Sequence, residues 1–261
     1  MPVFESINGQ EDGLAVYTDL TRRQLKNSGL FICEGIKAIE TALEYGYVPV
    51  SLLMERRHVI GKAAGLVRCL EKIPIYAPSD DAIENITGIR LSRGVLCAMK
   101  RREPAQLMDV LSDAENIAVL ETVNDDNNIG AIFRSAAALG MDAVILTRDC
   151  ADPLSRKSVR VSMGAVFRIP FTHIDALGAD GIALLKQCGF CCAALALTEN
   201  SMLLRDFSAK KCAFILGSES DGLKEETIRA CDKRIIIPMH SGMDSLNVAT
   251  AAAIAFYSLQ K

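Results

Sequence analysis

The sequence has no apolar run that is both long enough and uncharged enough to cross a lipid bilayer, so we expect no membrane-spanning segment. Residues 1–6 have neither a basic start nor an apolar stretch, and a secretory signal is therefore not expected. The chain also has no excess of positive charge, since its formal net charge is -3, and charge alone does not indicate a nucleic-acid-binding protein. Together these absences favour a cytoplasmic protein.

Disulfides and metal sites are not indicated either. The nine cysteines are scattered, with Cys191 and Cys192 adjacent, and we expect no zinc or redox site among them. Without export, these thiols are expected to stay reduced and to pack mainly in the core. The three histidines, His58, His173 and His240, are far apart and lack the spacing of metal ligands, so we expect no bound metal.

What the sequence does contain is many apolar residues and a clear change of pattern along the chain. Half of its 261 residues are apolar, which is enough for one large domain or two ordinary ones. Residues 1–103 have the pattern of a small α/β domain, and the polar stretch that includes Pro104 makes residues 104–114 a linker. Residues 115–261 then alternate apolar strands with helices, which predicts a doubly wound parallel sheet.

The apolar runs of this second region are typical of strands that are buried on both faces. We expect strands at 117–120, 143–146, 190–197, 212–216 and 234–237, an extended segment at 166–170, and helices at 129–139, 152–163, 182–187 and 245–259. In the first region we expect strands at 31–35, 47–54, 73–76 and 94–99 and a helix at 36–44.

Three polar segments lie between a predicted strand and a predicted helix, where the ligand sites of α/β proteins form. The first is residues 124–128, followed by Gly130 and by Arg134, whose fork of donors suits a phosphate or a developing oxyanion. Taken alone, this segment fits a polar helix cap followed by a surface arginine better than it fits a ligand site.

The second polar segment, residues 217–223, places two glycines around Glu219 directly after an apolar strand. It lacks the ending of a P-loop, and it is not a G-x-G-x-x-G fingerprint. Its acidic side chains would repel a pyrophosphate, so the turn favours a cationic or zwitterionic ligand. The third segment, residues 235–247, ends in Ser245 and Asn247, either of which suits the N-cap of the helix that follows.

Together, these segments resemble the signature motifs of the SpoU family of RNA ribose 2'-O-methyltransferases, in the SPOUT superfamily. The matching residues are Asn128-x-Gly130-x-x-x-Arg134, Gly217-x-Glu219-x-x-Gly222-Leu223, Ile237-Pro238-Met239 and Ser245-Leu246-Asn247-Val248-Ala249, and residues 160–167 are similar to the family segment between the first two motifs. The resemblance covers residues 115–261, and residues 1–103 more loosely resemble a small α/β RNA-binding domain of the ribosomal protein L30e type.

The resemblance implies a parallel α/β sheet with a C-terminal trefoil knot, a rare exception to unknotted topology, and a homodimer. It implies S-adenosylmethionine as the cofactor, held in the knot by residues that include Leu197, Thr198, Gly217, Ser218, Gly222, Ile237, Pro238, Met239, Leu246 and Ala249. It implies Arg134, Asn128, Glu219, Ser245 and Asn247 as the catalytic residues, with Arg134 reaching a site shared by two subunits, and it implies no metal.

The reaction implied is methyl transfer to a ribose 2'-hydroxyl of RNA, with the front domain favouring rRNA over tRNA. Because arginine rarely gives up its proton in proteins, we favour an electrostatic role for Arg134 over that of a base. Glu219 is expected to orient Arg134 or a neighbouring asparagine. Two alternatives stay open, a non-catalytic RNA-binding protein on the same fold and a nucleotide-binding oxidoreductase. The methylated nucleotide and a role in antibiotic resistance are not readable from the sequence.

Overall fold

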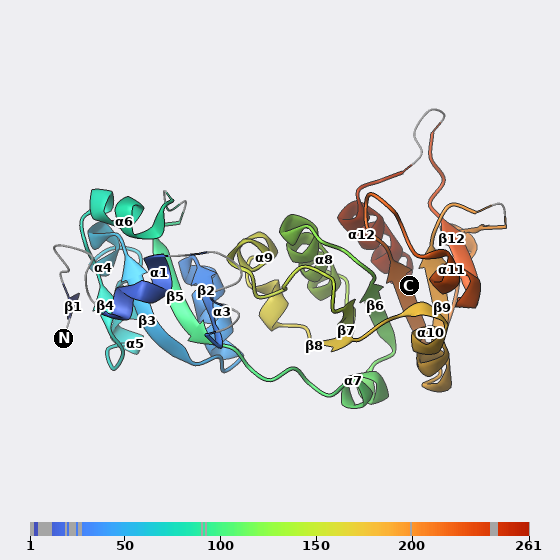
Figure 1. Ribbon diagram of the computed structural model, residues 1–261, viewed down its shortest axis with the longest axis horizontal. Coiled ribbons are helices and arrows are strands. Elements are labelled where there is room, and N and C mark those ends of the chain that lie inside the picture. Colours follow the sequence, from blue (N-terminus) through green and yellow to red (C-terminus); the bar gives the residue numbers. More distant parts are fainter. Residues whose placement is uncertain are drawn as a thin grey trace. The chain divides into compact units, whose positions relative to one another are not determined.

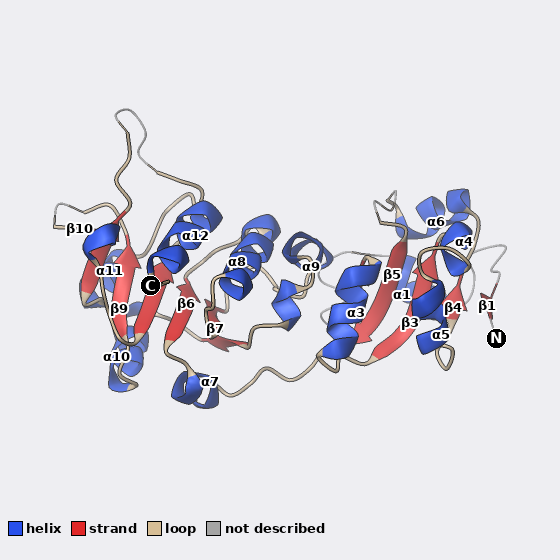
Figure 2. Ribbon diagram, turned by 180° about the vertical axis from the view of Figure 1, so that it is seen from behind, coloured by secondary structure: helices blue, strands red, loops and turns tan. Residues whose placement is uncertain are grey.

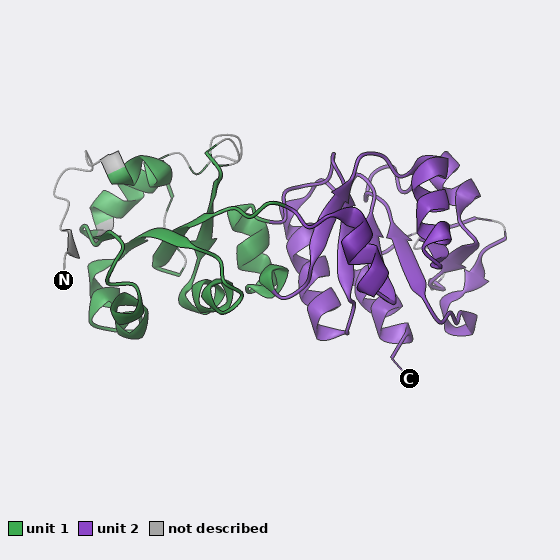
Figure 3. Cartoon of the chain, turned by 90° about the horizontal axis from the view of Figure 1, so that it is seen from below, with its two compact units in different colours: residues 1–103, 154–167 green, residues 104–153, 168–261 purple. Residues whose placement is uncertain are grey.

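The computed structural model describes residues 3–4, 12–18, 20, 25, 28–89, 91, 93–198, 200–240 and 245–260. The chain divides into two compact units, which Figure 3 shows in different colours: residues 1–103 with 154–167, and residues 104–153 with 168–261. The first boundary falls where the sequence predicts the end of the front domain. Residues 154–167, however, pack with the first unit although they lie inside the predicted second domain. The roles assigned to the two domains stay predictions.

The first unit contains a mixed sheet with the strand order β1-β4-β3-β5-β2. β5 is antiparallel to β2 and β3, whereas β4 is parallel to β3 and β1. The strands are β1 (Val3–Phe4), β2 (Leu30–Glu34), β3 (Pro49–Met54), β4 (Ile75–Tyr76) and β5 (Val95–Lys100). The helices are η1 (Asp12–Leu14), α1 (Ala15–Thr18), α3 (Ile36–Glu44), α4 (Arg56–Val59), α5 (Ala64–Cys69), α6 (Asp80–Thr87), α9 (Arg156–Ser162) and η2 (Ala165–Phe167). The predicted helix at 36–44 is confirmed as α3.

The α9–η2 segment is held in the first unit by a buried ion pair and by aromatic packing. The Glu34 carboxylate is fully buried and accepts a hydrogen bond from Arg156 Nη1 at 2.5 Å. The ring of Phe167 packs on that of Tyr47, with 4.8 Å between centroids. The predicted helix start at 152 is wrong, because Ser155 caps α9: its hydroxyl oxygen accepts the N–H of Ser158 at 3.1 Å.

The second unit contains a seven-stranded sheet with the order β10-β12-β9-β11-β6-β7-β8, and each strand pair between described residues is parallel. Figure 2 shows the strands of this sheet between layers of helices. The predicted parallel α/β sheet is thereby confirmed. The strands are β6 (Asn116–Leu120), β7 (Ala143–Thr147), β8 (Phe171–Ile174), β9 (Cys191–Leu195), β10 (Met202–Leu203), β11 (Cys212–Leu216) and β12 (Lys233–Ile236). The helices are α7 (Leu107–Asp113), α8 (Asp126–Ala138), α10 (Gly178–Gln187), η3 (Leu204–Asp206), α11 (Glu225–Ala230) and α12 (Val248–Ser258).

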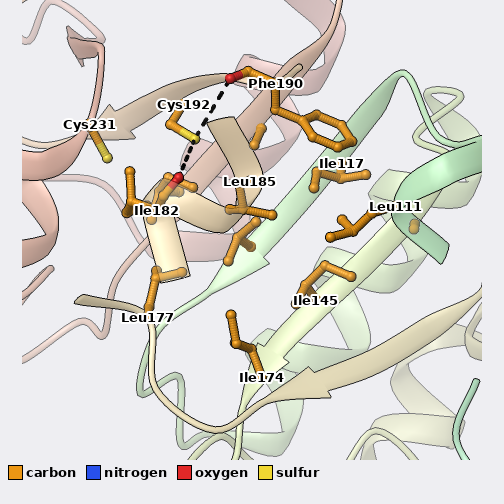
Figure 4. Close-up of a cluster of buried hydrophobic side chains, with 14 of the residues drawn as sticks. Leu111, Ile117, Ile145, Ile174, Leu177, Ile182, Leu185, Phe190, Cys192 and Cys231 are labelled. Carbon is orange, nitrogen blue, oxygen red and sulfur yellow. Dashed lines mark hydrogen bonds between the residues drawn. The ribbon is translucent and has the colours of Figure 1, made fainter. Parts of the chain in front are cut away.

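Helices cover both faces of this sheet. On one face, Leu185 of α10 and Leu111 of α7 pack with Ile117 and Ile215 of the central strands in a dry cluster, part of which Figure 4 shows. On the other face, α12 packs against α8 (Figure 1) and approaches the sheet through its aromatic ring, since the Phe256 centroid lies 6.4 Å from that of Phe214. The neighbouring residues Phe214 and Ile215 of β11 thus pack on opposite faces of the sheet, as expected for a strand that is buried on both faces.

Several parts of the second region differ from the prediction. α10 begins at Gly178 instead of 182, and α12 begins at Val248 instead of 245. The helix predicted at 129–139 begins at Asp126, because Asp125 caps it three residues earlier. The extended segment predicted at 166–170 is wrong: residues 165–167 form a short 3-10 helix, and the strand β8 follows at 171–174. β8 is an edge strand with alternating burial, which weakens its apolar signal. The short helix α11 has no counterpart in the prediction.

Candidate active site

The central strands of the second sheet mark a reversal of chain order. β6 lies between β7 and β11, so the chain moves outward to β7 and β8 on one side and later fills the other side. At such a reversal, the connections that follow two neighbouring strands diverge and leave a crevice at the carboxyl edge of the sheet. Leu120 and Leu216 are register partners at this edge, so the first and second polar segments begin side by side.

The first polar segment is organised by a helix cap. Oδ1 of Asp125 accepts the N–H of Asn127 at 2.7 Å and that of Asn128 at 3.1 Å. These bonds satisfy two donors that the start of α8 would otherwise leave unpaired. Asn128 is consequently held in the first turn of α8, where its side chain is only 7% exposed.

The loop between β6 and α8 contains a strained residue. Thr122 has φ 59°, an unusual conformation for a β-branched residue. Its N–H donates to Oγ1 of Thr147 at 3.0 Å, and its hydroxyl donates to Asp149 at 2.9 Å. Burial alone would raise the pKa of Asp149, but hydrogen bonds from Thr147 and Thr122 bring that pKa below its ordinary value. The loop is therefore fixed to β7 by a polar network that overcomes the strain.

The second polar segment is a closed turn. The N–H of Ser218 donates to the carbonyl of Gly222 at 3.2 Å, and the N–H of Gly222 donates back to Ser218 at 3.1 Å. A Cβ on Gly217 would lie 2.2 Å from the carbonyl carbon of Gly222, so only glycine fits at 217. Gly222 itself has φ +68°. Glu219 and Asp221 lie exposed at the tip of this turn.

The three polar segments meet at Asn247. Its Nδ2 donates to Oδ1 of Asn128 at 2.9 Å and also to Oε1 of Glu219. Its Oδ1 caps α12 by accepting the N–H groups of Ala249 at 3.0 Å and Thr250 at 3.3 Å. Of the five predicted catalytic residues, Asn128, Glu219 and Asn247 thus form one hydrogen-bonded cluster, called the amide cluster below.

The other two predicted catalytic residues lie outside the amide cluster. Arg134 follows Asn128 by six residues, which turns it about 120° around the helix axis, and its side chain is exposed. Within the described part of the chain, no hydrogen bond joins Arg134 to the cluster, and the contact of Glu219 is with Asn247. Ser245 lines the cavity described next.

A cavity of about 350 Å³ opens at the carboxyl ends of β9 and β12. Its lining is Leu195, Ala196, Leu197, Ile235, Ile236, Ile237, Met239, Ser245, Leu246 and Ala251. Its volume is at the lower end of the range of small-molecule sites, and its walls are mainly apolar. The residues present fit a cofactor with a flat apolar ring. Glu219 contacts Asn247, the residue that follows Leu246 of the lining, and its carboxylate suits a ligand that carries a positive charge.

Four of the ten predicted cofactor-binding residues line this cavity: Leu197, Ile237, Met239 and Leu246. Six others do not appear in its lining, namely Thr198, Gly217, Ser218, Gly222, Pro238 and Ala249. Thr198 is engaged in a local turn, since its N–H donates to Oγ of Ser201 at 3.1 Å. Ala249 is buried in the first turn of α12.

The lining residues that the prediction missed are Leu195, Ala196, Ile235, Ile236 and Ala251. Each is a small or apolar residue inside a strand, at its end or in a helix, and nothing in its type distinguishes it from core residues. The only available signal was position, because the last residues of parallel strands lie at the edge where ligands bind. Within the described residues, no helix is long and apolar enough to cross a membrane, and no cluster of His, Cys, Asp and Glu suits a metal ion.

The fold and the site together define an α/β protein with a ligand cavity and a polar cluster at the carboxyl edge of a parallel sheet. Residues 115–257 match the model of the SpoU rRNA Methylase family, so the chain belongs to this family, and the resemblance seen in the sequence is confirmed. An uncharacterized tRNA/rRNA methyltransferase of Mycobacterium bovis is 38% identical over 232 residues, which cover 87% of this chain and 80% of the relative. The 23S rRNA (guanosine(2553)-2'-O)-methyltransferase of Bacillus subtilis is 26% identical over 92% of each chain.

Solved structures show the same fold. The S-adenosylmethionine-bound rRNA methyltransferase of Sinorhizobium meliloti has a TM-score of 0.83 at 24% identity, with 98% of this chain and 97% of that chain covered. The SpoU methyltransferase AviRb of Streptomyces viridochromogenes, in complex with the same cofactor, has a TM-score of 0.80 at 23% identity over 95% and 97% of the chains. These likenesses extend over both units of the chain.

Proposed function

We propose that the protein transfers a methyl group from S-adenosylmethionine to a ribose 2'-hydroxyl of ribosomal RNA. One observation carries the proposal: the cavity and the amide cluster are joined by three consecutive residues. Ser245 and Leu246 line the cavity, and Asn247 is the centre of the cluster. A cofactor in the cavity and a ribose at the cluster would therefore be neighbours. The names of the relatives, which include 23S rRNA 2'-O-methyltransferases, support this choice of reaction and substrate.

When bound, S-adenosylmethionine supplies an electrophilic methyl group on a positively charged sulfur. Leu197, Ile237, Met239 and Leu246 would hold it through apolar contacts at the strand ends. The chain's own task is then to orient a weak nucleophile and to exclude water. In the amide cluster, Asn247 is fixed on both sides, because its amide group contacts Asn128 and its oxygen caps α12.

Arg134 would stabilise the oxyanion that develops on the 2'-oxygen, or grip the adjacent phosphate. Its exposure leaves its donors available to a substrate. In this role it keeps its proton throughout the reaction, since the guanidinium stays charged in proteins. Glu219 would hold the amide cluster in place through Asn247.

Finer features are part of the same proposal. The C-terminal end of the chain would form a trefoil knot that holds the cofactor, and residues 1–103 would act as an RNA-binding domain of the L30e type. The protein would be a cytoplasmic homodimer without a metal. Support for a partner comes from α12, where the side chains of Ile254 and Tyr257 are 38% and 67% exposed.

The test is methyl transfer from radiolabelled S-adenosylmethionine to rRNA that lacks this modification, followed by mapping of the methylated ribose. We expect incorporation by the wild-type protein and a loss of about 100-fold or more in Arg134→Ala. An Arg134→Ala protein with the wild-type rate would overturn the assigned role. A protein that binds rRNA but neither binds S-adenosylmethionine nor transfers its methyl group would support the non-catalytic alternative. Family membership leaves the oxidoreductase alternative without support.

A further inference from the structure

Glu121 is a buried carboxylate to which nothing above assigns a role. It follows β6 directly and is only 1% exposed. Its Oε2 accepts the N–H of Lys224 at 2.9 Å, and its Oε1 accepts the hydroxyl of Thr227 at 2.7 Å. A carboxylate that is buried to this extent is rare unless its oxygens are satisfied, as they are here. Both donors lie just beyond the turn that carries Glu219.

The same residue also holds the near end of that turn. The backbone N–H of Glu121 donates to the carbonyl of Leu216 at 2.9 Å, and Leu216 is the last residue of β11. Leu216 precedes the turn and Lys224 follows it. Glu121 therefore binds the chain on both sides of residues 217–223, once through its backbone and once through its side chain.

Between these two attachments, the turn has little freedom of its own. Ser218 and Gly222 exchange two backbone hydrogen bonds, and Gly217 touches the backbone of Gly222 so closely that a Cβ is excluded. The Ser218 hydroxyl accepts the N–H of Asp221 at 3.1 Å. The positions of the two ends of the turn therefore determine the position of Glu219 at its tip.

Glu121 is itself anchored. The next residue, Thr122, is held in its strained conformation by Thr147 and Asp149, as described above. The side chains of Glu121 and Thr122 thus tie the end of β6 to two different neighbours, the turn after β11 and the end of β7. A strand end that is held rigidly in this way fixes the position of the segment bound to it, here the turn of residues 217–223.

We propose that Glu121 is a positioning residue for methyl transfer: it closes the turn of residues 217–223 and so sets Glu219 against Asn247 in the amide cluster. The inference rests on the proposed methyltransferase function. Glu121 touches neither the cavity nor the cluster, and its effect passes through Glu219. As a consequence, its carboxylate is needed as a hydrogen-bond acceptor and not as an acid or a base.

Three variants test the proposal by steady-state methyl transfer to unmodified rRNA. Glu121→Ala removes the acceptor, and we expect kcat to fall by about 10- to 100-fold, the effect of a displaced catalytic group. Glu121→Gln keeps an oxygen for the N–H of Lys224 and an amide for the Thr227 hydroxyl, and we expect kcat within about 3-fold of wild type. The matched control is Asp142→Ala, because the Asp142 carboxylate accepts two backbone N–H groups at the opposite end of β6.

The control should leave kcat within about 2-fold of wild type, since it lies at the amino edge of the sheet, away from the cluster. The affinity for S-adenosylmethionine, measured by calorimetry, should stay within about 3-fold in Glu121→Ala, because Glu121 is not among the residues that line the cavity. Equal loss of kcat in Glu121→Ala and Asp142→Ala would overturn the proposal, as would an inactive Glu121→Gln.

A double-mutant cycle with Glu219→Ala gives the decisive readout. If Glu121 acts through Glu219, adding Glu121→Ala to Glu219→Ala should lower kcat by less than about 3-fold. The same loss in both backgrounds would show an independent structural effect and refute the proposal. Should circular dichroism show that Glu121→Ala is unfolded, Thr227→Val replaces it in the cycle, because it removes one of the two donors and keeps the volume. A wild-type protein without activity would refute both the inference and the proposed function, whereas an active wild type with an equally active Glu121→Ala refutes the inference alone.

Discussion

Asn247 has two duties that a pair of substitutions can separate. Its oxygen caps α12, and its amide nitrogen holds Asn128 and Glu219. Asn247→Ala removes both functions. Asn247→Asp keeps an oxygen for the cap and removes the donor to the cluster.

The stability cost of each change follows from these contacts. In Asn247→Ala, loss of the cap costs about 1 kcal/mol, and the buried Oδ1 of Asn128 loses its donor at about 1–3 kcal/mol. The sum of about 2–4 kcal/mol lowers Tm by about 4–16 °C. In Asn247→Asp, the carboxylate caps α12 well, and its charge favours the helix N-terminus by about 0.3–1 kcal/mol. Repulsion from the exposed Glu219 is of similar size. Oδ1 of Asn128 loses its donor here too, at about 1–3 kcal/mol, so Tm should fall by about 2–12 °C, which is less than in Asn247→Ala because the cap is kept.

Activity should not follow stability in this pair. Both variants break the amide cluster, and we expect methyl transfer to rRNA to fall about 100-fold in each. Calorimetric unfolding and the transfer assay at a temperature well below both midpoints separate the two effects. An Asn247→Asp protein that keeps the wild-type rate, or one as unstable as Asn247→Ala, would refute the separate roles assigned to the oxygen and the nitrogen of Asn247.

Three further predictions follow from the packing of the chain. Gly217→Ala forces a Cβ to within 2.2 Å of backbone and should destabilise the protein by about 1–3 kcal/mol or more in thermal unfolding, whereas Gly65→Ala meets nothing within 4 Å and should raise stability slightly. Burial raises the pKa of Cys192 to about 12, so mass spectrometry after alkylation at pH 8 should find it unmodified in the folded protein, while the exposed Cys69 is labelled. Because the pKa of Asp149 is lowered on folding, its carboxylate stabilises the protein above about pH 4, and this contribution is lost as pH falls further. Asp149→Asn should therefore be less stable than wild type at pH 7. A stability difference between the two proteins that failed to shrink below pH 4 would contradict this account.

Local sequence predicted the strands that are buried on both faces. The run from Ile117 to Leu120 and the run at 212–216 have no polar residue, and both are central strands of the sheet. Boundaries were less accurate where a cap or an edge decides them. α8 begins early because of the side chain of Asp125, and β8 was missed because an edge strand alternates in burial.

For the site, too, the sequence predicted some features and missed others. Motif similarity named Asn128, Glu219 and Asn247 together, and the structure joins them by hydrogen bonds. Similarity did not indicate which partner Glu219 has, nor that Arg134 is outside the cluster. Glu121 was missed altogether, since an acidic residue after a strand is ordinarily a solvated loop residue.

By itself, the sequence determined the class of the sheet, the family and the residue types at the strand ends, because these depend on local apolar patterns and short motifs. Only the tertiary structure decided which of those residues meet. The reversal of strand order places β6 beside β11, and the capping of α12 brings Asn247 to the same edge. Contacts between residues 119 positions apart, such as Asn128 with Asn247, arise from the closure of the sheet and its helices, and no local preference encodes them.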